Sequence, residues 1–220
     1  MIVAVAGGKG GVGKSTVALN LGVELGAVVV DADLAMADLP AGRGPDLHDV
    51  LAGRADPVET VRRVGPVALL PCGRTLAGAR ACDLTEFASA MAALATEHER
   101  VVVDCPAGLA ADAGLPLVAA DACVLVTTPR RFALADAVRT RALARRFDAG
   151  LACVALNRVG DDPPTDGVRR TLGAPVVPIP ESTTVARAQR SGRPVASLAP
   201  GSASAERFGE LARTVQFCRS

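Results

Sequence analysis

The amino-acid sequence predicts an α/β fold, a doubly wound, mostly parallel sheet flanked by helices. Two observations carry this prediction. Short apolar runs rich in β-branched residues alternate with helical stretches from one end of the chain to the other, which is typical of a parallel sheet covered on both faces. These runs are continuously apolar, as strands buried on both faces require. No repeat and no long linker divides the 220 residues, so we expect one domain over 1–220.

The expected elements follow from these runs and from the stretches between them. The strands are predicted at 2–6, 27–31, 67–70, 101–104, 122–127, 152–157 and 175–178. The helices are predicted at 16–25, 84–96, 133–147, 166–172, 183–191 and 203–217, several of them ending at glycine or before proline. Phe208, Leu211 and Val215 recur at helical spacing, so the last helix should pack onto the core. The segments 34–65, 161–164 and 199–201 carry no regular pattern and are expected to be irregular.

Composition excludes several classes of protein. The net charge is +1, so no global field draws the chain to nucleic acid or anionic lipid. The first residues lack the basic region of a signal peptide, and the apolar run there is too short to cross a bilayer, so a cytoplasmic protein is expected. The six cysteines include no C-x-x-C pair, which argues against a disulfide framework or a single-chain zinc site.

A glycine-rich loop follows the first expected strand. Residues 8–16 read Gly-Lys-Gly-Gly-Val-Gly-Lys-Ser-Thr, which matches G-x-x-x-x-G-K-[ST] and opens a helix. The glycines let backbone N–H groups surround phosphate oxygens, and the helix N-terminus adds positive charge. We expect Lys14 to bridge the β- and γ-phosphates and the Ser15 hydroxyl to bind Mg²⁺, so the predicted cofactors are ATP and Mg²⁺. The predicted nucleotide-binding residues here are Gly8, Lys9, Gly10, Gly11, Val12, Gly13, Lys14, Ser15 and Thr16.

Lysine use points to the same loop. Of 24 basic residues only Lys9 and Lys14 are lysines, which indicates that these two positions need a compact ammonium group. The string 9–16 resembles the deviant Walker A motif of the MinD/ParA family of ATPases, in which the early lysine reaches the partner's nucleotide across a dimer interface. The resemblance implies that Lys9 acts in trans, stabilising the ATP-bound dimer and the charge that develops during hydrolysis. Lys9, Lys14 and Asp33 form the predicted catalytic set.

Asp33 enters through a second motif. Residues 31–39, Asp-Ala-Asp-Leu-Ala-Met-Ala-Asp-Leu, resemble switch I of the family. This resemblance implies that Asp33 positions the attacking water near Mg²⁺ and that Asp31 supports the magnesium shell. Asp38 has no assigned role, since an exposed loop carboxylate or a helix cap would explain it equally well.

Residues 101–108, Val-Val-Val-Asp-Cys-Pro-Ala-Gly, resemble the second acidic motif and switch II of the family. A carboxylate at the tip of a buried apolar strand is costly without a partner, and hydrated Mg²⁺ is a natural one. Asp104 is therefore placed beside the metal, and the predicted metal set is Ser15, Asp33 and Asp104. Gly108 would let the loop move towards the γ-phosphate, and Cys105 is expected to be a packing residue.

Two later segments resemble the base pocket of MinD-type proteins. Asn157 and Arg158 follow one strand, and 178–182 follows the next. The resemblance implies that the Asn157 amide reads the adenine edge and that 178–181 forms the wall. Asn157, Arg158, Pro180 and Glu181 are the predicted base-side residues. The segments 47–53 and 179–195 also resemble MinD-like ATPases, so the resemblance covers nearly the whole chain.

The resemblance implies a nucleotide switch. An ATPase of this family would dimerise with ATP, hydrolyse it slowly alone and faster with an activating protein, and serve to position the division site, a chromosome or plasmid, or another complex. The single domain is then a P-loop ATPase domain. No histidine base is required, so His48 and His98 are expected to be surface residues.

Alternatives remain open at this stage. Six arginines between Arg130 and Arg146 resemble the patches through which ParA relatives bind DNA nonspecifically. An iron–sulfur carrier of the Mrp type is a further alternative, although the C-x-x-C of those relatives is missing. A small-molecule ligase on the same fold would need a second substrate pocket, for which no residues stand out. Peripheral membrane contact is also open, although no clear C-terminal targeting helix is present.

Overall fold

The structure is a computed structural model that describes residues 1–8, 10–34, 39, 43–108 and 111–218. Within them an eight-stranded sheet runs in the order β3-β4-β2-β5-β1-β6-β7-β8. All neighbouring strands are parallel except β3, which pairs antiparallel with β4. The strands are β1 (Ile2–Ala6), β2 (Val28–Asp31), β3 (Arg62–Val64), β4 (Val67–Leu70), β5 (Val101–Asp104), β6 (Ala122–Thr127), β7 (Gly150–Val159) and β8 (Val176–Pro180).

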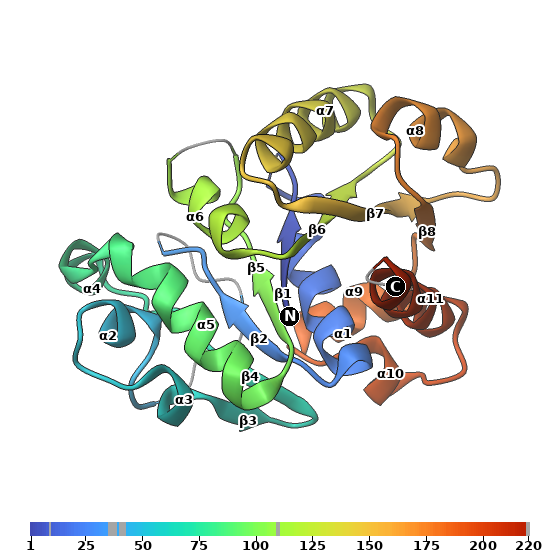
Figure 1. The fold of residues 1–220 in the computed structure, drawn as a ribbon. Coiled ribbons are helices and arrows are strands. Elements are labelled where there is room, and N and C mark those ends of the chain that lie inside the picture. Colours follow the sequence, from blue (N-terminus) through green and yellow to red (C-terminus); the bar gives the residue numbers. More distant parts are fainter. Residues whose placement is uncertain (9, 35–38, 40–42, 109–110, 219–220) are drawn as a thin grey trace.

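Helices cover both faces of this sheet (Figure 1). The helices are α1 (Lys14–Leu25), α2 (Leu47–Leu51), α3 (Pro57–Thr60), α4 (Leu76–Ala81), α5 (Phe87–His98), α6 (Ala111–Ala119), α7 (Arg131–Arg146), α8 (Thr165–Leu172), α9 (Thr183–Arg190), α10 (Val195–Leu198) and α11 (Ala203–Phe217). Helices α1 and α11 pack on one face with α9 and α10 beside them, while α5 to α8 pack on the other. The predicted doubly wound α/β fold is confirmed.

Alternation along β1 shows how one strand supplies both layers of the core. Val3 and Val5 join a cluster with residues of α1 and α11, whereas Ile2 packs with Phe87 of α5. Because successive side chains of a strand point to opposite faces, a continuously apolar strand suits a sheet covered on both sides. The last helix buries Phe208, Leu211 and Val215, as predicted.

Several elements differ from the sequence-based expectation. The segment 34–65 is more regular than expected, because it holds α2, α3 and the short antiparallel β3. Helix α6 was not predicted, since Gly114 lies within it and so does Pro116, a residue that usually ends helices. Helices α4 and α10 were also missed. The expected helix 84–96 begins with a 3₁₀ turn, Leu84–Glu86, before α5.

None of the helices in the described part of the chain is long and apolar enough to cross a membrane.

Candidate functional site

A cavity of about 480 Å³ lies where β1, β2 and β5 end. The strand order reverses at β1, which has β5 on one side and β6 on the other, and ligands of open α/β sheets bind at such a point. The residues that follow these strands therefore meet at one edge of the sheet. The predicted site residues that line this cavity are Gly10, Gly11, Gly13, Lys14, Ser15, Thr16, Asp33, Asp104 and Arg158.

The glycine-rich loop turns directly into α1. Gly13 is the residue before the helix and has a left-handed backbone with φ of 100°. A Cβ atom there would lie 2.2 Å from the Nδ2 atom of Asn157, so only glycine fits. The first turn of a helix leaves N–H groups without acceptors inside the helix, and this turn faces the cavity. The arrangement suits a phosphate group.

Two acidic side chains stand opposite each other at the ends of β2 and β5. Asp31 and Asp104 are register partners, and both are buried. The Asp31 carboxylate accepts hydrogen bonds from the N–H groups of Asp33 (3.2 Å) and Leu39 (3.1 Å). Asp31 thus fixes the loop that carries Asp33, whereas Asp33 and Asp104 reach the cavity wall. The predicted support of the magnesium shell by Asp31 stays a prediction.

The predicted metal ligands fit Mg²⁺ by their chemistry. The Ser15 hydroxyl and the carboxylates of Asp33 and Asp104 line the same cavity, and hard oxygen donors are what Mg²⁺ prefers. Lys14 is buried and lines the same cavity. Lys9 and Asp38 lie outside the described residues, so the role of Lys9 in catalysis and nucleotide binding remains a prediction.

The predicted base-side residues gather at a smaller cavity of about 150 Å³ beside Thr16, lined by Asn157, Arg158, Pro180 and Glu181 among others. The Asn157 amide already has a partner there, since Nδ2 donates to the carbonyl oxygen of Val12 in the glycine-rich loop (2.8 Å). This contact was not predicted, and the reading of adenine by Asn157 stays a prediction. Arg158 has a left-handed backbone (φ of 56°) where the β7–β8 register shifts.

Two residues around the loop were missed by sequence reasoning. Asn20 on α1 donates from Nδ2 to the carbonyl oxygen of Thr16 (2.7 Å) and accepts from the N–H of Val195 through Oδ1 (2.7 Å). An amide inside the apolar stretch 17–23 of α1 was the available signal. Asp136 of α7 packs closely against the loop: a Cβ atom added at Gly8 would lie 2.3 Å from the Cβ atom of Asp136. No local pattern pointed to that contact.

The cysteines near the site behave as packing groups. Cys105 follows Asp104 and is buried, and burial raises the pKa of its thiol, with nearby Cys123 and Asp104 acting in the same direction. Burial also raises the pKa of Cys123 to about 12. A thiol that stays protonated is a poor metal ligand. Among the described residues, no group of three or more histidine, cysteine and acidic side chains could hold a metal ion.

The expectation for His48 was wrong. Its side chain is 2 % exposed, because α2 turns it into the space between β4 and α4 rather than towards solvent. His98, at the end of α5, is partly buried.

A parallel sheet, a glycine-rich loop leading into a helix, and oxygen ligands at the strand ends together define a P-loop nucleotide-binding protein. The chain belongs to the family of CobQ/CobB/MinD/ParA nucleotide-binding domains, whose sequence model matches residues 3–195. The resemblance to the MinD/ParA family is thereby confirmed.

Relatives and solved structures agree with this family. An uncharacterised ATP-binding protein of Methanocaldococcus jannaschii is 31 % identical over 226 residues, which cover 96 % of this chain and 85 % of the relative. The cell division ATPase MinD of Pyrococcus furiosus superposes with a TM-score of 0.92 at 29 % identity, covering 99 % of this chain and 98 % of that one. The septum site-determining protein MinD of Pyrococcus horikoshii, solved with Mg-ADP, gives 0.91 at 28 % identity, covering 100 % and 97 %.

Proposed function

We propose that the chain is a single P-loop ATPase domain over 1–220 that binds ATP with Mg²⁺, hydrolyses it to ADP and phosphate, and dimerises in the ATP-bound state. The observation that carries the proposal is the one cavity wall shared by Lys14, Ser15, Asp33 and Asp104. ATP-binding and MinD proteins among its relatives support the choice of nucleotide. By analogy with those MinD proteins, the switch would serve positioning inside the cell.

The charge of the cavity lining supports a nucleoside triphosphate as the ligand. The cavity is lined by the cations Lys14, Arg158, Arg190 and Arg193 and by the two carboxylates Asp33 and Asp104. The cations are in excess, whereas a magnesium-bound triphosphate carries net negative charge. The negative charge of this ligand would therefore neutralise the excess positive charge of the cavity lining.

The proposed chemistry needs positioning and electrostatics, and no covalent intermediate. The loop N–H groups and Lys14 would hold the phosphates, and Ser15 and Asp104 would hold Mg²⁺. When bound there, Mg²⁺ would neutralise charge on the phosphate oxygens. Asp33 would orient the attacking water, and Lys9 would add its charge from the second subunit.

The proposed dimer would form on the edge of the sheet that carries the loop. Gly10 and Gly11 are exposed there, between the nucleotide cavity and a second cavity of about 580 Å³. Phe132 lines this second cavity and is 80 % exposed. An exposed aromatic side chain beside the phosphate loop would give a second copy of the chain an apolar anchor.

The proposal is tested by sizing the purified protein with ADP, with ATP and Mg²⁺, and with ATP for the Lys9→Ala variant. We expect the native chain to be a dimer with ATP and Mg²⁺ and a monomer with ADP. The Lys9→Ala variant should stay a monomer with ATP. ATP hydrolysis measured on the same samples should fall in the variant. A native chain that stays monomeric at saturating ATP would contradict the switch.

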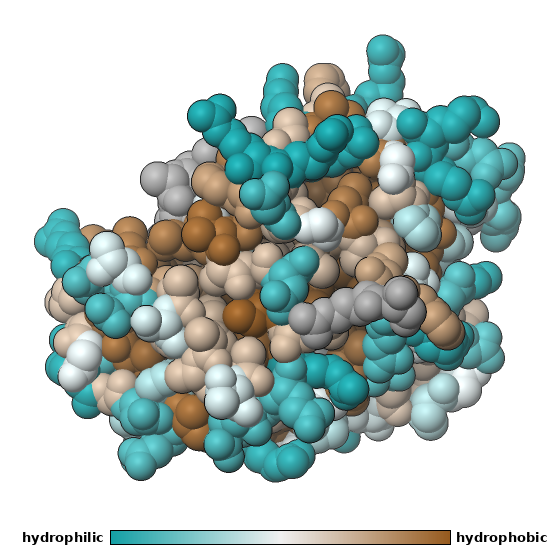
Figure 2. Space-filling model, viewed as in Figure 1, coloured by the Kyte–Doolittle hydropathy of each residue, from teal (hydrophilic) through white to brown (hydrophobic). Residues whose placement is uncertain are grey.

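Nonspecific DNA binding is the second candidate function. Arg131, Arg139, Arg145 and Arg146 are exposed on α7, and Arg169 and Arg170 are exposed on α8 beside it. Figure 2 shows hydrophilic side chains gathered over these two helices. If this surface binds DNA, binding should require ATP and weaken steeply as salt rises. Equal or absent binding with and without ATP would remove this function.

A further inference from the structure

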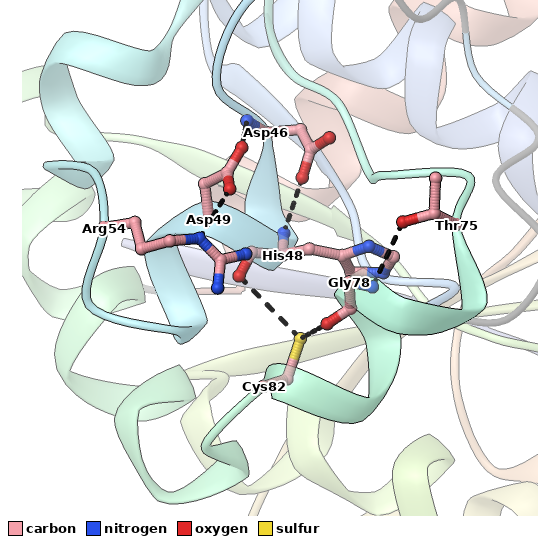
Figure 3. A network of polar contacts seen from close by, with 7 residues as sticks. All are labelled: Asp46, His48, Asp49, Arg54, Thr75, Gly78 and Cys82. Carbon is pink, nitrogen blue, oxygen red and sulfur yellow. Dashed lines mark hydrogen bonds and ion pairs between the residues drawn. The ribbon is translucent and has the colours of Figure 1, made fainter.

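His48 is a buried polar side chain that the proposed chemistry does not use. It lies on α2, and Figure 3 shows it at the centre of a network that includes Asp46, Thr75 and Cys82. Its ring nitrogen Nε2 is 3.1 Å from the carbonyl oxygen of Leu34. Leu34 directly follows Asp33, whose carboxylate lines the nucleotide cavity.

The partner of Nε2 decides the form of the ring. A carbonyl oxygen can only accept a hydrogen bond, so Nε2 carries the hydrogen and donates to Leu34. The Sγ atom of Cys72 lies 3.5 Å from the same nitrogen. Burial, followed by the charges of Asp31 and Asp46, raises the pKa of Cys72, so a neutral thiol stands beside the ring.

Two glycines provide the space that the ring of His48 occupies. A Cβ atom at Gly73 would lie 2.2 Å from Nδ1 of His48, and one at Gly78 would lie 2.6 Å from it. The backbone of α2 is fixed as well, because the Asp46 carboxylate accepts from the His48 N–H (2.8 Å) and the N–H of Leu47 donates to Pro71 (2.9 Å). The Nε2 donor is therefore held at one place relative to β4.

We infer that His48 is a positioning residue: by holding the Leu34 carbonyl, it fixes the loop that presents Asp33 to the nucleotide. This inference rests on the proposed role of Asp33. Asp31 holds the N–H groups of Asp33 and Leu39, and His48 holds a carbonyl oxygen between them in the sequence. The N–H of Leu34 donates to the carbonyl oxygen of Ala32 (3.1 Å), so the contact from His48 fixes the carbonyl side of the same residue. Without this contact, the carbonyl group that follows Leu34 is held less firmly, and the direction of the Asp33 side chain becomes less well defined.

Two polar replacements of His48 differ in reach alone. In His48→Gln the side-chain amide nitrogen can occupy the place of Nε2, whereas in His48→Asn it ends near Nδ1, short of Leu34. We expect kcat for ATP hydrolysis to fall about ten- to a hundredfold in His48→Asn, since small displacements of a positioned group cost this much. The Gln variant should retain most of kcat. KM for ATP should change less than about twofold in both, because the contact is absent from the nucleotide pocket.

Arg54→Ala is the matched control. It removes the ion pair with Asp49 (2.9 Å) in the same network without touching Leu34, so its kcat should be native. A general loosening of this region would lower kcat in Arg54→Ala as well. Equal loss of kcat in the Asn and Gln variants would show that reach to Leu34 is irrelevant, and would overturn the inference.

Amide hydrogen exchange gives a readout that does not depend on hydrolysis. In His48→Asn the N–H groups of Asp33 and Leu39 should exchange about five- to tenfold faster, as expected when one partly buried hydrogen bond is lost, and in His48→Gln they should stay near native. Unchanged exchange in His48→Asn would overturn the inference while leaving an ATPase intact. If the native chain hydrolysed no ATP, the proposed function would fail, and the exchange rates would still decide the role of His48.

Discussion

At the scale of single residues, Gly13 meets two separate constraints. Its backbone is left-handed, and the Asn157 amide fills the space that a side chain would need. Gly13→Ala should therefore cost about 1–3 kcal/mol in backbone strain and also push Asn157 away from Val12. We expect nucleotide binding, measured with a fluorescent ATP analogue, to be lost or weakened more than about a hundredfold.

Gly26 offers the matched control for this prediction. It is also left-handed, with φ of 61°, but a Cβ there meets nothing within 4 Å. Gly26→Ala should lower the unfolding free energy by about 1 kcal/mol and leave nucleotide affinity native. If Gly13→Ala bound nucleotide as well as Gly26→Ala does, the close contact with Asn157 would be unimportant for the loop.

The raised pKa of the Cys123 thiol predicts that the stability of the fold depends on pH. Its pKa rises from 9.0 to about 12 on folding because the thiol is buried in the sheet. Between these values the folded chain binds more protons than the unfolded chain, so its contribution to stability is complete below 9.0 and is lost as pH rises towards about 12. Urea unfolding should show a slope of up to about 1.4 kcal/mol per pH unit from this group. The slope should be shallower in Cys123→Ala, and an identical slope would exclude Cys123 as its source.

At the scale of elements, local pattern identified the buried strands and long-range contacts decided the rest. Strands β1, β4, β5 and β6 have the predicted bounds because each is an apolar run, which ends on a polar residue in β5 (Asp104) and in β6 (Thr127). Helix α6 could not be predicted, because Pro116 within it is a local signal against a helix. Its stability comes from packing on α5 and β1, which local sequence does not show. His48 could not be predicted as buried, since the glycines that make room for it, Gly73 and Gly78, lie far along the chain.

In the candidate site, too, local motifs identified some residues and long-range contacts determined the others. The residues that line the cavity from the glycine-rich loop, together with Asp33 and Asp104, could be named from strand-end motifs. The amides that hold this site together, Asn157 to Val12 and Asn20 to Val195, join segments more than a hundred residues apart, and no local pattern shows such pairs.

The side-chain amide of Asn20 links α1 to α10 by a hydrogen bond. Its Oδ1 accepts from the buried N–H of Val195, and its Nδ2 donates to Thr16. Asn20→Ala would leave that N–H without its partner, so we expect the unfolding free energy in urea to fall by about 1–3 kcal/mol. Thr96→Ala removes an exposed side-chain hydrogen bond to Ala92 and should change stability by less than about 0.5 kcal/mol. Equal effects of the two changes would argue against the link.

At the scale of the whole molecule, the ends of the parallel strands bring two cavities to one edge of the sheet. Gly10, Gly11 and Arg158 line both of them, so a ligand in the first cavity and a protein partner over the second would share a wall. Nucleotide binding could thus alter a protein surface directly, without transmission through the core.

The exposed phenylalanines allow a test of this arrangement. Phe132 lies beside the loop and is 80 % exposed, while Phe217 at the end of α11 is 75 % exposed and lines neither cavity. Phe132→Ser should weaken the proposed ATP-dependent dimer by about 2 kcal/mol or more, as expected for an aromatic anchor at an interface. Phe217→Ser should leave the dimer unchanged, and both variants should bind ATP as the native chain does. Sedimentation velocity with ATP and Mg²⁺ measures the first outcome, and a dimer of native strength in Phe132→Ser would place the interface elsewhere on the molecule.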